Sequence, residues 1–213
     1  MIGRLQRRRA RGDRGAVLIE LVIITPILFT IILGVFDLGL AWRASITISN
    51  AVRSASRVDA NLGKADSSDL AALQALSAAA STIPSSQIDV IVIYKSTTPD
   101  GDVPAACVTT TARLAGGVAA SNCNTYSQTD YINAQNGTGG FANGFTGLCS
   151  SSGRRDRFWC ATNRVNDQAA SGGPDYVGVY IKVIHRTATK MFGATIDIDD
   201  HAVMRIEPNA GNP

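Results

Sequence analysis

The stretch that decides the fold is residues 14–42, RGAVLIELVIITPILFTIILGVFDLGLAW. After its leading arginine only Glu20 and Asp37 are charged, and residues 21–36 between them are uncharged and rich in Ile, Leu and Val. About twenty such residues in a helix cross a hydrocarbon core of roughly 30 Å. Lipid offers no partner for unpaired backbone groups, which requires a helix there. The sequence therefore predicts one transmembrane segment, at residues 16–42.

A basic segment precedes this span. It holds six arginines and one acidic residue, Asp13, which leaves it at a net charge of +5. Arginines beside an apolar span favour the cytoplasmic side of the membrane. We therefore expect residues 1–15 to be a cytoplasmic leader and residues 43–213 to be an exported domain. The protein is then a single-pass protein of the cell membrane, in contact with the lipid bilayer.

The expected exported domain has no excess of positive charge. Outside the leader the chain has 14 basic and 16 acidic residues. Nucleic-acid binding usually depends on neutralising phosphates with Lys and Arg. This balance argues against a nucleic-acid partner.

Four cysteines in the expected domain predict two disulfides. Cys107, Cys123, Cys149 and Cys160 lie where an oxidising compartment allows disulfides to persist. Four cysteines allow three pairings, of which we favour the sequence-local pairs Cys107–Cys123 and Cys149–Cys160. Zinc is the alternative, but there is no Cys-x-x-Cys motif and no nearby histidine.

Hydrophobic periodicity predicts an α+β fold. Beyond the span, small and apolar residues recur every three or four positions up to Leu62, and Gly63 then supplies a stop signal. This small-residue stripe packs either on the protein's own domain or against neighbouring subunits. A second helix is expected at residues 67–81. Apolar or alternating runs predict strands, and hence a small antiparallel sheet, at residues 88–95, 176–186 and 195–207.

Residues 96–173 are a Gly-, Ser-, Thr- and Asn-rich stretch of low periodicity that contains all four cysteines. Structureless loops of this length are unusual inside a compact domain. We therefore predict a disulfide-stapled insertion on the outer edge of the domain.

Groups that could carry enzyme chemistry are scarce. His185 and His201 lie on different predicted strands, and only the second has neighbouring carboxylates, Asp199 and Asp200. Residues 136–147 are glycine-rich but lack the lysine of a phosphate-binding loop. We expect no catalytic residue, no metal, no cofactor and no small-molecule substrate.

Glu20 is unusual because it stands inside the apolar helix. A carboxylate at the centre of a membrane helix costs about 2.5–3.5 kcal/mol, and less near the interface, so a partner is expected. If the Glu20 side chain reached back to the lipid headgroups, a carboxylate would be tolerated here. That would not explain why Glu20 stands five positions after Gly15.

Residues 14–58 resemble the TadE-like pseudopilins of the tight-adherence pilus system. The resemblance begins with Gly15 and Glu20, which look like the processing site of type IV pilin-like proteins, and continues with Pro26 six residues later. Residues 34–39, GVFDLG, match the glycine-acid-glycine pattern of the family at the helix exit. Residues 50–57, NAVRSASR, resemble its alanine-arginine repeat.

Two further features mark how far the resemblance extends. Residues 202–208, AVMRIEP, resemble the closing strand of the family, whereas the insertion has no counterpart. Leu21 departs from the family, because many members have an aromatic residue after the glutamate.

The resemblance implies a part in assembling an adhesive pilus. A prepilin peptidase would cut after Gly15, and the new amino terminus at Ala16 would pair with Glu20 of a neighbouring subunit. Pro26 and Asp37 are further expected contacts in assembly. The implied partners are the peptidase, other pilin or pseudopilin subunits and the pilus machinery, and the protein would reside in the membrane or in the pilus.

Two other interpretations remain open. The first is a secreted binding module whose cleaved signal peptide ends at Ala41, since residues 39–41 form a small-x-small site. The apolar region is longer than the usual 7–15 residues and carries two carboxylates, which argues against it. The second is a membrane-anchored enzyme, for which we find no supporting set of residues.

Overall fold

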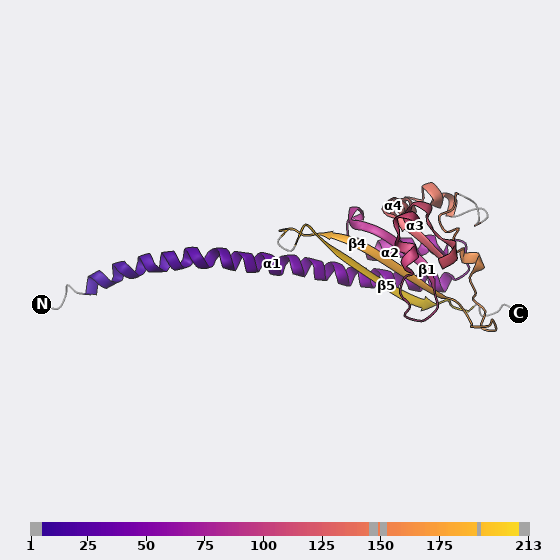
Figure 1. The fold of residues 1–213 in the computed structure, drawn as a ribbon, viewed down its shortest axis with the longest axis horizontal. Coiled ribbons are helices and arrows are strands. Elements are labelled where there is room, and N and C mark those ends of the chain that lie inside the picture. Colours follow the sequence, from indigo (N-terminus) through magenta and orange to yellow (C-terminus); the bar gives the residue numbers. More distant parts are fainter. Residues whose placement is uncertain (1–5, 145–148, 150–152, 191–192, 209–213) are drawn as a thin grey trace.

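The computed structural model of the chain describes residues 6–144, 149, 153–190 and 193–208. Helix α1 (Gln6–Leu62) contains 57 residues, and its N-terminal part extends well beyond the rest of the molecule (Figure 1). Its C-terminal part lies within an α+β domain (Figure 1). The helix ends as predicted, because Gly63 has a φ of 52°, which glycine adopts without strain.

The domain contains an antiparallel sheet of five strands in the order β2-β3-β1-β4-β5. The strands are β1 (Ile88–Ser96), β2 (Gly117–Val118), β3 (Cys123–Ser127), β4 (Tyr176–Arg186) and β5 (Thr195–Arg205). Strands β1, β4 and β5 are the three that the sequence predicts. The β4–β5 hairpin reaches back along α1 towards its N-terminal end (Figure 1).

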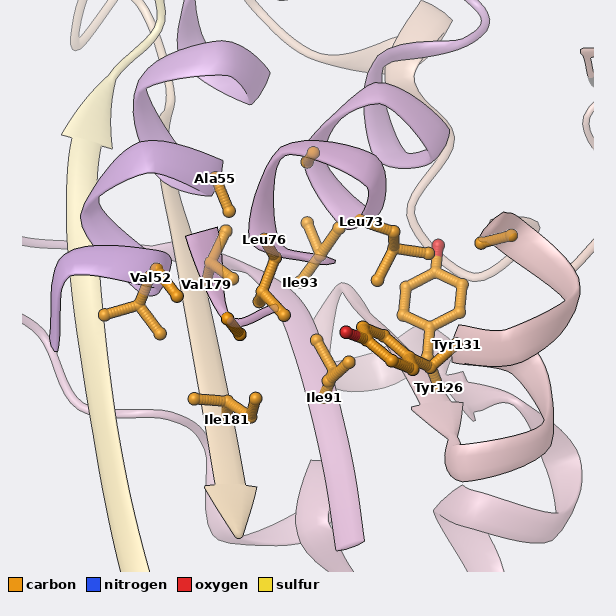
Figure 2. Packing of buried hydrophobic residues seen from close by; sticks show 14 of the residues in the cluster. Val52, Ala55, Leu73, Leu76, Ile91, Ile93, Tyr126, Tyr131, Val179 and Ile181 are labelled. Carbon is orange, nitrogen blue, oxygen red and sulfur yellow. The ribbon is translucent and has the colours of Figure 1, made fainter. Parts of the chain in front are cut away.

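Helices α1 and α2 (Ser68–Ala79) bring apolar side chains against one face of the sheet (Figure 2). The small-residue stripe of α1 is part of this core, since Ala51, Val52 and Ala55 are 0% exposed. Leu73 and Leu76 of α2 belong to the same core (Figure 2). Between residues 48 and 60 the stripe therefore packs on the protein's own domain.

The insertion is more regular than its sequence suggests. It contains α3 (Thr110–Ala115), α4 (Gln128–Asn136), β2 and β3. Strand β3 pairs with β1 from Val90↔Ser127 to Tyr94↔Cys123, so the insertion extends the sheet. These elements have only two to nine residues, which is too short for hydrophobic periodicity to identify them.

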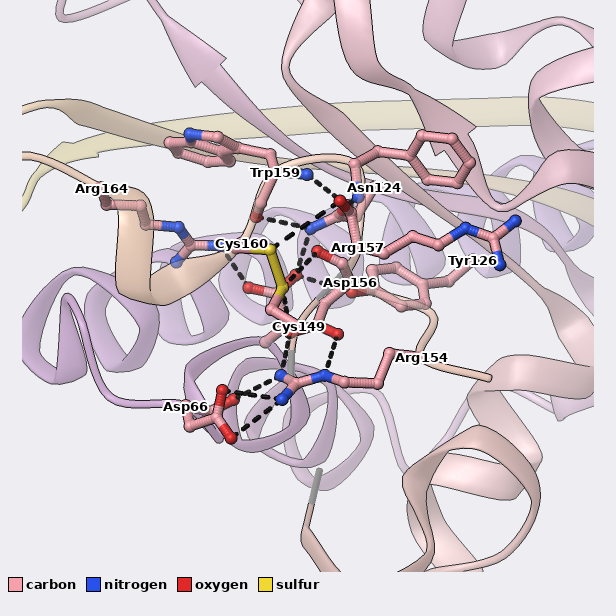
Figure 3. Close-up of a disulfide and its surroundings, with 12 residues drawn as sticks. Asp66, Asn124, Tyr126, Cys149, Arg154, Asp156, Arg157, Trp159, Cys160 and Arg164 are labelled. Carbon is pink, nitrogen blue, oxygen red and sulfur yellow. Dashed lines mark hydrogen bonds and ion pairs between the residues drawn. A yellow bond between two sulfur atoms is a disulfide. The ribbon is translucent and has the colours of Figure 1, made fainter. Parts of the chain in front are cut away.

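Both disulfides have the pairing that the sequence favours. Cys107 is bonded to Cys123, and Figure 3 shows the bond between Cys149 and Cys160. The first bond lies in the apolar cluster on the second face of the sheet, together with Tyr94. It therefore fastens the start of the insertion to strand β3.

A buried ionic network fastens the end of the insertion to α1 and α2. The Arg164 side chain is 0% exposed and forms ion pairs with Asp59 of α1, at 2.7 Å, and with Asp69 of α2. Its guanidinium carbon lies 4.2 Å from the centre of the Trp159 ring. Asp69 also accepts a hydrogen bond of 2.6 Å from the Tyr126 hydroxyl. Charge and hydrogen bonding thus join segments that are far apart in the sequence.

Candidate functional site

The candidate site is the uncovered part of α1, the stretch from Val17 to Leu38 whose large apolar side chains the domain leaves exposed. Between Val17 and Leu38, the large apolar side chains are 41 to 72% exposed. An 18-residue window in this helix has a mean hydropathy of 2.7 and no buried residue. Within the described part of the chain, this is the one helix that is long and apolar enough to cross a membrane. So large an exposed apolar surface indicates contact with lipid or with other helices.

The predicted processing residues lie at the start of this surface. Gly15, Ala16 and Glu20 are all exposed. Glu20 follows Gly15 by about 7.5 Å along the helix axis. No ion pair or hydrogen bond to the Glu20 carboxylate occurs among the residues that the structure describes. The partner that the sequence analysis expects for this carboxylate is therefore not among the described residues.

Pro26 lies inside α1, which continues through it. Because proline has no N–H, the Val22 carbonyl loses its usual partner four residues later. The hydroxyls of Thr25 and Thr30 donate to the carbonyl oxygens of Leu21 and Pro26, at 2.6 and 2.7 Å. These bonds hold both hydroxyls against the helix and away from lipid.

Asp37, the third expected assembly contact, is bound by another part of the same chain. Its side chain is 1% exposed, although it belongs to the predicted span. The Ala188 N–H donates to its Oδ1 at 3.0 Å, and the Thr189 N–H donates to its Oδ2 at 3.2 Å. The Thr189 hydroxyl donates to it as well. The carboxylate expected to contact other subunits is thus occupied by the tip of the protein's own β4–β5 hairpin.

The two histidines considered for a metal site do not lie close together. His201 is paired with Tyr180 across the hairpin and His185 with Ile196, which places the two histidines five positions apart on their ladder. The His201 Nε2 atom lies 3.7 Å from Asp102 Oδ1. Among the described residues, no group of three His, Cys, Asp or Glu is arranged to hold a metal ion.

Two features of the site escaped the sequence analysis. One is the hairpin contact of Asp37, for which a carboxylate in an apolar helix was the only signal. The other is a cavity beside α1 that includes Arg43 and His185. Neither residue lies in a recognisable motif, so no local signal could have identified it.

The arrangement defines a class: a single-pass membrane protein whose spanning helix continues into the core of an α+β domain. The model of the TadE-like protein family matches residues 15–57, which confirms the resemblance over the uncovered part of α1 and its first turns in the domain. No curated protein and no solved structure is significantly similar to the chain. The family match and the uncovered helix together fit a membrane-anchored protein of pilus assembly.

Proposed function

We propose that this protein is a TadE-like pilus assembly protein or minor pseudopilin. Residues 1–15 lie in the cytoplasm, the first part of α1 crosses the cell membrane, and the domain lies outside. The observation that carries the proposal is that the family match, residues 15–57, includes the apolar surface of α1 that stays exposed from Val17 to Leu38. The arginine-rich leader supports the orientation, because arginines favour the cytoplasmic side.

Processing after Gly15 by a prepilin peptidase is the second part of the proposal. It would remove the leader and leave a positive amino terminus at Ala16. That amine and the Glu20 carboxylate of a neighbouring subunit would form an ion pair, which offsets the free energy of burying either charge alone. Removing the arginines would also release the helix from the cytoplasmic surface, so that it could pass from lipid into an assembly.

The proposed assembly contacts on the span are Glu20 and Pro26. The Glu20 carboxylate is exposed, and Pro26 leaves a carbonyl of the preceding turn without its helical partner. Asp37 instead holds the hairpin, as its hydrogen bonds indicate. We therefore propose a role for Asp37 within the subunit rather than between subunits.

Mass spectrometry of the mature N-terminus, in membrane and sheared-pilus fractions, tests this proposal. The wild-type chain should begin at Ala16, whereas Gly15→Ala should keep its leader. A Cβ at position 15 meets no other atom within 4 Å, so this substitution leaves the helix undisturbed. Glu20→Gln should be processed but depleted from the sheared fraction.

Two outcomes would overturn parts of the proposal. An intact Met1 in cells that contain the peptidase would exclude processing and leave a membrane-anchored assembly factor. A mature chain that begins at Trp42 would instead support the secreted binding module.

A further inference from the structure

A cavity of about 210 Å³ lies beside α1 just beyond the apolar span. Its walls come from α1, from the segment between α2 and β1, and from the end of β4 nearest the hairpin tip. The polar side chains that line it are Arg43, Thr47, Thr82, Gln87 and His185, and the remaining lining is apolar. No carboxylate is part of the lining.

Several polar groups of the cavity have no partner among the residues that the structure describes. Arg43 is exposed, and among the described residues no carboxylate lies within ion-pair distance of its guanidinium. The Nε2 atom of His185 is shielded from solvent and has no hydrogen-bond partner in the described part of the chain. The hydroxyl of Thr82 and the amide of Gln87 add further donors. Such a set suits a group of anionic oxygens, and a phosphate above all.

Counted along α1, the cavity lies at the level expected for the membrane surface. If the hydrocarbon core begins near Ala16, twenty residues end near Val35. Arg43 then lies about 12 Å further along the helix axis, and a long arginine side chain can reach back towards the headgroup layer. Trp42, which is 72% exposed, is next to it, and exposed tryptophans are typical of this layer.

The end of the β4–β5 hairpin next to the cavity is positively charged, as Arg43 is. From Ile184 to Ile196 the chain contains His185, Arg186 and Lys190 and no acidic residue, and Arg186 and Lys190 are exposed. Asp37 anchors this hairpin but is buried beneath it, outside the lining of the cavity. Basic residues close to a bilayer attract anionic lipids.

We propose that the cavity binds the phosphate headgroup of one anionic phospholipid from the leaflet on the domain side. Arg43 binds the phosphate oxygens, and the apolar lining contacts the upper part of the lipid. A zwitterionic lipid with an ammonium group is disfavoured, because the lining offers that group no carboxylate. The proposal rests on the membrane anchor of the proposed function and is independent of processing at Gly15.

Native mass spectrometry of the full chain, extracted from vesicles of equal phosphatidylglycerol and phosphatidylcholine content, tests this proposal. The wild-type protein should retain one phosphatidylglycerol in preference to phosphatidylcholine. Arg43→Gln should lower that preference about tenfold, as expected for the loss of a charge-assisted contact. The matched control is Arg53→Gln, because Arg53 is also exposed on α1 and lies about 15 Å further from the membrane.

Three outcomes would overturn the proposal. They are equal retention of both lipids by the wild-type protein, an equal loss in Arg43→Gln and Arg53→Gln, or displacement of the lipid by millimolar inorganic phosphate, which would indicate a site for free anions. The thermal unfolding midpoint of Arg43→Gln should match that of the wild-type protein. Resistance to carbonate extraction, measured in parallel, separates failure of this proposal from failure of the membrane anchor.

Discussion

Arg164 joins the insertion to both α1 and α2 through buried ion pairs. It shares one positive charge between Asp59 and Asp69, so the buried group has a net negative charge. Burial raises the pKa of Asp59 to about 6, and the negative charge of Asp69 adds to this effect while Arg164 opposes it. The Oδ2 atom of Asp59 has no hydrogen-bond partner among the described residues. Removing Arg164 would therefore leave two poorly compensated carboxylates in the core.

We expect Arg164→Met to lower the free energy of unfolding by about 3–5 kcal/mol, as is typical when one partner of a buried ion pair is removed. Denaturant unfolding of the full chain in detergent would measure the change. Fluorescence of Trp159 is a local probe, since Arg164 stacks on its ring.

Arg57→Met is the matched control for this prediction, because Arg57 is exposed on α1. It should change the free energy of unfolding by less than about 0.5 kcal/mol. Equal stability of the two variants would show that the network contributes nothing.

The β4–β5 hairpin is the element that fastens the domain to the part of α1 near Asp37. Its strands have 11 residues each and pair along their whole length. Ser56 of α1 donates to the Ala202 carbonyl at 2.8 Å near one end, and Asp37 binds the tip at the other. The hairpin is therefore fastened to α1 over 19 residues, or about 28 Å of helix. It should turn with the helix rather than independently of it.

Asp37→Ala should release the hairpin tip without unfolding the domain. The Ala188 and Thr189 amides lose their acceptor, so their hydrogen exchange should become about tenfold faster or more. Exchange measured by mass spectrometry on the full chain in nanodiscs would test this.

Two variants control the interpretation of that experiment. Thr189→Val loses only the hydroxyl donor and should have an intermediate effect, whereas Glu20→Ala, far from the hairpin, should have none. Unchanged exchange in Asp37→Ala would mean that other contacts hold the tip.

At the scale of the whole molecule, α1 is both the anchor and a part of the core. Its apolar surface before residue 39 is uncovered, and its buried stripe begins at Ile48. The family match at residues 15–57 crosses this boundary. The family signature therefore covers both the membrane segment and the turns that organise the domain.

A chain that begins at Arg43 should therefore keep a folded domain, and one that begins at Lys64 should not. The shorter chain lacks Ile48 and Val52 of the core and Asp59 of the ionic network. Each large buried side chain lost costs about 1.5–3 kcal/mol of apolar burial, which together approaches the whole stability of a domain.

Near-ultraviolet circular dichroism and denaturant titration of both chains, with disulfides formed, would test this prediction. Cooperative unfolding of the chain from Lys64 would contradict it. The chain that begins at Arg43 lacks Asp37, so its hydrogen exchange should be faster at the hairpin tip alone.

The sequence by itself determined the features that depend on neighbouring residues. The span follows from an uninterrupted apolar run, the end of α1 from Gly63, and strands β1, β4 and β5 from their apolar or alternating patterns. The favoured disulfides are local as well, with sequence separations of 16 and 11 residues. Local chain geometry and the length of an apolar run are written in consecutive residues, so pattern reasoning can find them.

Only the tertiary structure decided which distant groups meet. Arg164 lies 105 residues from Asp59, and Thr189 lies 152 residues from Asp37. Strands β2 and β3 were missed because pairing with β1, rather than their own pattern, makes them strands. The cavity at Arg43 likewise exists only where α1 and β4 come together. A buried charge or an unpaired donor indicates that a partner is needed, but the folded chain alone determines which residue provides it.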